Sequence, residues 1–306
     1  MNITAATVNE LRQATGCGLM DCKKALVECE GDTQKAILYL REKGLASQAK
    51  KASRVAAEGM AYAATIDGVG VLVEVNCETD FVATGDPFVN FVKSLAEVIA
   101  KQAPADVEAL MQCKWVDGKS TVDDAKNELF LALRENMNIR RFVRIEGGVS
   151  VPYVHMKGKI GVIVNLETEG GIDATEIGKD VAMQIAALNP RFWDKSNVTD
   201  EVLEEEKKIA LALMDQDPKM ASKPQQVKEK IVMGKMNKFY EENCLLQQEF
   251  VKDNSMTVEK YIASAAKALG GSVKFVDAVR FMKGEGIEKK QEDFAAEVAA
   301  QMNMGK

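Results

Sequence analysis

Side chains that could carry out chemistry are sparse in this chain of 306 residues. The chain has one histidine, His155, and six cysteines at scattered positions. A single histidine excludes metal sites built from several imidazoles and leaves little material for histidine-based acid–base catalysis. Cys17, Cys22 and Cys29 lack the paired spacing that zinc ligands show. We therefore expect no metal site.

One catalytic pair can be written, with Cys77 as the nucleophile and His155 as its base. Cys77 falls on the apolar face of an expected strand, Val71–Cys77, where a thiol is usually inert. A P-loop motif is missing from the sequence, and neither Gly68-Val69-Gly70 nor Gly284-Glu285-Gly286 has the third glycine of a dinucleotide site. These patterns predict a protein that is not an enzyme and that needs no cofactor.

A different kind of site is indicated by Phe81, in the run Thr79-Asp80-Phe81-Val82. This run follows the expected strand, and a similar run later in the chain has Gly170 and Gly171 where an aromatic residue would stand. An aromatic side chain at a strand exit suits an apolar wedge aimed at a partner protein. The alternative is that Phe81 covers the end of its own sheet.

The elements that must position these residues begin with three short helices in residues 1–54. Thr4 and Asp32 are suitable N-caps for the first and third, and Gly16 and Gly44 are suitable ends. Fifty residues in three helices make a marginal core, so we expect an interaction module. Leu19 and Met20, after a Gly-Cys-Gly turn, are candidate contact residues, and half-buried packing is the alternative.

From residue 58 the hydrophobic period changes to that of strands, and a pattern then occurs twice. Gly70-Val71-Leu72-Val73 is echoed by Gly161-Val162-Ile163-Val164, and each is followed by a helix that stops at a proline, Pro104 or Pro190. Strands are also expected at 142–146, 149–154 and 273–282, with a helix at 121–136. The pattern predicts an α+β core of two related halves.

Two charged helices, Glu201–Met214 and Gln225–Tyr240, interrupt the second half, with Pro218 and Pro224 between them. They predict a helical hairpin that projects from the core, either as an arm for association or as a solvated spacer. A last helix would carry Phe294, Val298 and Met302 on one stripe.

Composition fits a soluble cytoplasmic protein. Hydrophobic residues make up 46% of the chain, charged residues 28%, and the net charge is −6. No apolar run is long enough to span a membrane, and the start resembles no signal or transit peptide. Residues 1–54 hold nine basic and six acidic residues. This small positive charge, next to an acidic remainder of the chain, would attract nucleic acid only weakly.

Four segments, in order, resemble signatures of the bacterial-type elongation factor Ts family. They are Thr15-Gly16-Cys17-Gly18-Leu19-Met20-Asp21-Cys22-Lys23-Lys24-Ala25-Leu26, Glu74-Val75-Asn76-Cys77-Glu78-Thr79-Asp80-Phe81-Val82, Asn138-Ile139-Arg140-Arg141, and Gly284-Glu285-Gly286-Ile287-Glu288-Lys289 with Asp293-Phe294-Ala295-Ala296-Glu297-Val298-Ala299. Together they run through almost the whole chain.

The resemblance implies a division into five parts. Residues 1–54 would be a three-helix domain of the ubiquitin-associated type, 55–148 the first core half, and 149–190 with 241–282 the second. Residues 191–240 would be an inserted coiled-coil arm and 283–306 a C-terminal module. Dimerisation through the arm is a further expectation.

The resemblance also implies a partner and contact residues. The family promotes guanine-nucleotide exchange on the GTPase elongation factor Tu, whose Mg²⁺ and phosphate region is disturbed by the segment that is here Thr79 to Val82. Asp80 would be its polar anchor. Arg12, Leu19 and Met20 would form an N-terminal contact, and His155 a contact from the second half. Two alternatives are an adaptor that binds a partner through its N-terminal module and a basic-ended RNA-associated protein.

Overall fold

The computed structural model describes residues 3–217, 220 and 223–288. Its centre consists of two antiparallel sheets of three strands each. The first sheet has the order β1-β2-β3, and its strands are β1 Glu58–Ile66, β2 Val69–Cys77 and β3 Asn138–Ile145. The second has the order β4-β5-β8, and its strands are β4 Val149–His155, β5 Ile160–Glu169 and β8 Ser272–Met282. The α+β class predicted from the sequence is confirmed.

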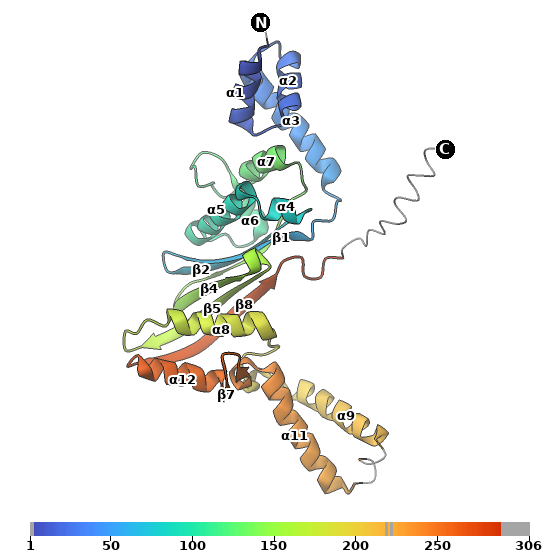
Figure 1. The fold of residues 1–306 in the computed structure, drawn as a ribbon, viewed down its shortest axis with the longest axis vertical. Helices are drawn as coiled ribbons and strands as arrows, with labels where there is room; N and C mark the ends of the chain where they lie inside the picture. The colour runs from blue at the N-terminus through green and yellow to red at the C-terminus, as the bar shows by residue number, and fades with distance from the viewer. Residues whose placement is uncertain (1–2, 218–219, 221–222, 289–306) are drawn as a thin grey trace, which may run out of the picture.

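The two sheets pack against each other, and helices cover their outer faces (Figure 1). α5 (Asp86–Gln102) and the short α6 (Val107–Gln112) lie on the first sheet, and α7 (Val122–Leu133) packs against both of these helices. α8 (Thr175–Leu188) and α12 (Val258–Ala268) lie on the second. Small and apolar residues fill the space between the sheets: Ala61, Ala63, Leu72, Ile163 and Phe281. Both faces of the central strands are therefore buried.

Three helices precede the sheets: α1 Ala5–Thr15, α2 Leu19–Glu28 and α3 Thr33–Lys51. The expectation that the third helix ends at Gly44 is wrong, because α3 continues to Lys51. A Cβ atom at Gly44 would lie 2.0 Å from Cδ2 of Leu131 on α7. Gly44 therefore allows α3 to approach α7 closely and does not end the helix.

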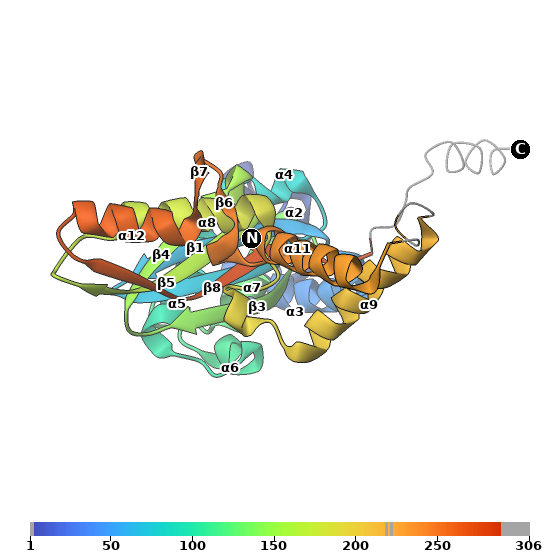
Figure 2. The same cartoon turned by 90° about the horizontal axis from the view of Figure 1, so that it is seen from below.

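The helical hairpin expected at residues 201–240 consists of α9 (Asp200–Gln216) and α11 (Gln225–Asn243). It projects away from the sheets in both views (Figures 1 and 2). A short hairpin, β6 (Glu249–Phe250) with β7 (Asp253–Thr257), then returns the chain to α12. The arm has a small apolar core of its own: Ala210, Met214, Val232 and Met236.

The last helix expected from the sequence, with Phe294, Val298 and Met302, lies outside the described residues. The five-part division of the chain stays a prediction.

Candidate functional site

Phe81 is the most exposed large apolar side chain among the described residues, with 83% of its surface accessible. It lies on α4, Asp80–Ala83, a single helical turn directly after β2. Thr79 is the N-cap of this turn, and its side-chain oxygen accepts a hydrogen bond from the Val82 N–H at 3.3 Å. Asp80, in the same turn, is also exposed.

The other side of α4 is buried. Val82 is 7% exposed and Ala83 is 3% exposed, and both belong to the apolar core under the first sheet. α4 is thus held to the core by one face while Phe81 points away from it. Phe81 therefore does not cover the end of its own sheet.

A carboxylate from a distant part of the chain fixes the start of α4. Glu135 Oε2 accepts hydrogen bonds from the backbone N–H groups of Glu78 at 3.1 Å and Thr79 at 3.0 Å. Its Oε1 accepts a third from the Thr79 hydroxyl at 2.6 Å. The sequence reasoning missed Glu135, because it follows α7 and no periodicity ties it to residue 79.

The catalytic alternative at Cys77 has no support. Its side chain is fully buried, and the thiol donates to the Thr79 carbonyl at 3.2 Å. Burial, assisted by the nearby Glu135 carboxylate, raises the pKa of the Cys77 thiol to about 12. The reactive thiolate is therefore scarce at neutral pH.

His155 ends β4 and is half-buried. Its Nδ1 lies 2.9 Å from the Tyr153 hydroxyl, and the two rings stack with centroids 5.9 Å apart. The next residue, Met156, is 63% exposed and has a positive φ of 47°. This turn and α4 both contact β1. Met156, which the sequence reasoning did not single out, is therefore the more accessible residue of this turn.

The N-terminal candidates lie on a separate part of the molecule, the three-helix unit at the top of Figure 1. Leu19 and Met20 begin α2 and are 45% and 61% exposed. Arg12, in the last turn of α1, is also exposed. The structure does not bring these three residues into contact with Phe81. It presents two surfaces, one on α4 and one at the α1–α2 turn.

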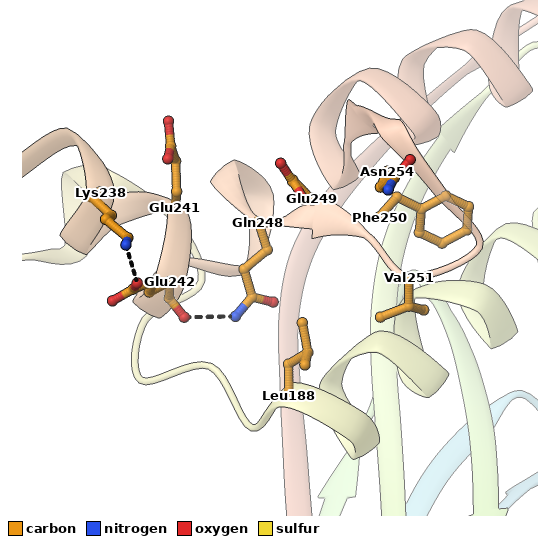
Figure 3. A pocket seen from close by; sticks show the side chains of 9 residues that line it. All are labelled: Leu188, Lys238, Glu241, Glu242, Gln248, Glu249, Phe250, Val251 and Asn254. Carbon is orange, nitrogen blue, oxygen red and sulfur yellow. Dashed lines mark hydrogen bonds and ion pairs between the residues drawn. The ribbon is translucent and has the colours of Figure 1, made fainter.

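An open cavity of about 520 Å³ lies elsewhere, between the end of α8, the last turns of α11 and the β6–β7 hairpin (Figure 3). Leu188 and Val251 contribute apolar surface, and Gln248 donates to the Glu242 carbonyl at 3.0 Å. None of the residues proposed to contact a partner lines it.

Within residues 3–217, 220 and 223–288, no group of three or more His, Cys, Asp or Glu side chains is placed to hold a metal ion. Nor does any helix in the described part of the chain have the length and apolar character needed to cross a membrane.

Comparison with known proteins identifies the family of this chain. A model of the family described as "Elongation factor TS" matches residues 78–285, which include α4, strand β3 of the first sheet, the whole second sheet and the arm. An elongation factor Ts of Clostridium kluyveri is 48% identical, and the match covers 98% of this chain and 99% of the relative. Those of Trichlorobacter lovleyi and Clostridium botulinum strain 657 are 47% and 46% identical, over 98% and 99% of this chain and 98% and 100% of the relatives. The chain belongs to the elongation factor Ts family of translation elongation factors.

Proposed function

We propose that this chain binds elongation factor Tu with GDP and promotes GDP release, with Phe81 as the wedge. The observation that carries the proposal is the exposure of Phe81 on a turn whose other side is buried. An exposed aromatic side chain on a fixed turn can enter a partner's pocket with little loss of conformational entropy. The GTPase identity of the partner comes from the family.

Exchange follows from reciprocal coupling. If the factor binds nucleotide-free Tu more tightly than Tu with GDP, then GDP must bind more weakly to Tu that carries the factor. A coupling on the order of 3 kcal/mol weakens the nucleotide roughly a hundredfold. Disturbing the Mg²⁺ that bridges the phosphates is a physical source of such a term. GTP then reloads, and the factor leaves.

The test is the rate of fluorescent GDP release from elongation factor Tu. Phe81→Ala should lose most of the acceleration and keep the melting temperature, because the removed ring is 83% exposed. Val116→Ala is the matched control, since Val116 is a 51% exposed apolar residue in the loop between α6 and α7. Full activity of Phe81→Ala would mean that another residue acts as the wedge. A wild-type protein that does not accelerate GDP release would contradict the proposed function.

An adaptor that uses only its N-terminal module is less well supported. Leu131 of α7 belongs to the apolar core of the three-helix unit, so the unit shares its core with the rest of the chain. Arg12, Leu19, Met20 and His155 remain proposed secondary contacts with Tu.

On this proposal the chain acts in the cytoplasm without performing a chemical reaction, and it requires neither nucleic acid nor membrane. Association of two copies through the arm stays a prediction. Ile209, Leu213 and Met233 supply exposed apolar surface there. Light scattering of the purified protein tests it, and a monomer mass at high concentration would count against it.

A further inference from the structure

The segment that follows α7 contacts both the Phe81 turn and the N-terminal three-helix unit, two of the parts that the proposed function brings to its partner. We propose that Arg134, Glu135 and Asn136 form a positioning clamp, which holds the Phe81 turn and the N-terminal three-helix unit in one fixed arrangement. This inference rests on the proposed function and adds three residues that would act through Phe81, Leu19 and Met20 without touching the partner.

Glu135 holds the wedge. Its carboxylate accepts two backbone N–H groups and one hydroxyl from Glu78 and Thr79, at 2.6 to 3.1 Å. The Thr79 oxygen in turn accepts from the Val82 N–H, so the carboxylate is connected to α4 through one hydroxyl. A helix of a single turn is unstable alone because nucleation is unfavourable. The orientation of α4 therefore depends on these bonds and on buried Val82 and Ala83.

Asn136, 4% exposed, holds the segment that joins the three-helix unit to β1. Its side-chain amide donates to the carbonyls of Ala52 at 3.3 Å and Arg54 at 2.8 Å. Its backbone N–H donates to the Glu78 carboxylate at 2.7 Å, and the same carboxylate pairs with the Arg54 guanidinium at 3.3 Å. Glu78 directly precedes the wedge segment, so the linker and the wedge share one anchor.

Arg134 holds the three-helix unit itself. Its guanidinium donates to the Asp21 carboxylate on α2 at 2.8 Å, two residues from Leu19. Its carbonyl accepts from the Lys51 ammonium at the end of α3 at 2.5 Å. Three consecutive residues thus bind α2, α3, the linker and the start of α4.

A fixed arrangement matters because the two contact surfaces lie on different parts of the chain. When one surface is bound, a rigid connection presents the second at a high effective concentration and in the correct orientation. A loosened clamp leaves both surfaces intact but lowers the fraction of encounters in which Phe81 enters its pocket.

The first test is Glu135→Ala in the full chain, measured as fluorescent GDP release from elongation factor Tu at saturating factor. We expect a roughly tenfold lower rate, since charge-assisted hydrogen bonds that orient the wedge are lost. In the Phe81→Ala background the same change should have no further effect. Glu128→Ala is the matched control, because Glu128 lies on α7 and pairs with Arg41 at 3.5 Å but does not bind α4. Wild-type activity of Glu135→Ala, or an equal loss in the Phe81→Ala background, would overturn the clamp.

A second pair of variants keeps the test decisive if Glu135→Ala unfolds. Thr79→Val removes the hydroxyl that connects Glu135 to α4, and Thr79→Ser retains it. We expect Thr79→Val to lose more of the activity than Thr79→Ser, because only the serine variant retains the hydroxyl bonded to Glu135. Equal activity of the two variants would overturn the role of this bond.

Amide hydrogen exchange in the free protein separates this inference from the proposed function. If wild type fails to accelerate GDP release, the function is wrong, but the clamp can still be tested. The Val82 amide should exchange at least tenfold faster in Glu135→Ala than in wild type. Unchanged exchange would overturn the clamp even if the function is correct.

Discussion

At the scale of single residues, Glu74 on β2 is a fully buried carboxylate, and its charge needs partners inside the protein. Arg140 donates to it at 3.0 Å, Arg141 at 2.6 Å, and the Gly284 N–H at 2.8 Å. Glu74→Gln would remove the buried negative charge that both arginines share, and of the two only Arg141 would keep a second carboxylate among the described residues, that of Glu285 at 3.4 Å. We expect a loss of about 3 kcal/mol in the free energy of unfolding at pH 7, measured by urea denaturation.

The pH dependence of this variant gives a sharper check. Burial alone would raise the pKa of Glu74, but the Gly284 N–H, Arg141 and Asn76 outweigh it and hold the pKa below its usual value. A lowered pKa in the folded state contributes stability above the unfolded pKa of about 4.3, and this contribution is lost as the pH falls through the folded pKa. The difference between wild type and Glu74→Gln should therefore narrow below about pH 4.3.

The matched control is Glu146→Gln. Glu146 pairs with Arg144 at 2.6 Å, but its side chain is 67% exposed, so the change should have little effect on stability. If Glu74→Gln and Glu146→Gln lowered the free energy of unfolding equally at neutral pH, the result would contradict the role given to burial.

Some single residues could be assigned a role from the sequence, and others, Glu74 among them, could not. Phe81 could be identified because an aromatic residue stands where the related segment has glycine. Glu74 and Asn76 alternate with valines, a pattern typical of a strand with one solvent face. The second sheet covers that face instead, and only the structure shows the cover. Glu135 is 56 residues from Thr79, so no local pattern connects them.

At the scale of elements, two helical glycines show how packing decides the effect of one substitution. Gly234→Ala on α11 should stabilise the protein by about 0.5–1 kcal/mol, because no atom lies within 4 Å of the added methyl group. Gly44→Ala on α3 should destabilise it by about 1–2 kcal/mol, because the methyl group would overlap the buried Leu131 side chain. Thermal and urea unfolding of both variants check the opposite signs. A stabilised Gly44→Ala would mean that α3 and α7 separate without cost.

Long elements could be predicted where the hydrophobic residues recur with a clear helical or strand period, as in the two arm helices and in strands β2, β5 and β8. α12 was missed, although Val258, Ile262 and Ala266 recur every four residues after the N-cap Thr257. α4 was expected as part of a loop. Its single turn depends on the Thr79 cap and on packing against the core. A segment of four residues is too short to show a hydrophobic period, so the sequence contains no sign of this helix.

At the scale of the whole molecule, the repeated sequence pattern corresponds to two halves that pack reciprocally. A methyl group at Gly70 of β2 would lie 3.2 Å from Ile163 of β5, and one at Gly161 of β5 would lie 2.6 Å from Leu72 of β2. Each central strand has an irregularity in one pairing, between Glu74 and Val75 or between Asn165 and Leu166. These places correspond in the repeat.

The helix ends correspond as well. α5 and α8 both end in a left-handed residue before proline, Ala103 with φ 48° and Asn189 with φ 47°. On β3, Arg144 stands opposite Val71 and donates to the Ile99 and Ala100 carbonyls at the end of α5. Arg280 stands opposite Val162 in the second half. The repeated pattern is visible in the sequence, but the face-to-face packing of the two sheets could not be predicted from it, because a repeat does not indicate which faces meet.

Reciprocal packing makes a prediction that belongs to both halves at once. Gly70→Ala and Gly161→Ala each place a methyl group within 3.0 Å of the opposite sheet, where the nearest atoms include Ser150 Cβ at 2.7 Å and the Ala61 carbonyl oxygen at 2.8 Å. Each should lower the free energy of unfolding by roughly 2 kcal/mol. The double variant should lose less than the sum, because a separation of the sheets that accommodates one methyl group also makes room for the other. Urea denaturation of the two single variants and the double variant measures this difference. Strict additivity would mean that each half yields locally and that the sheets do not move as rigid layers.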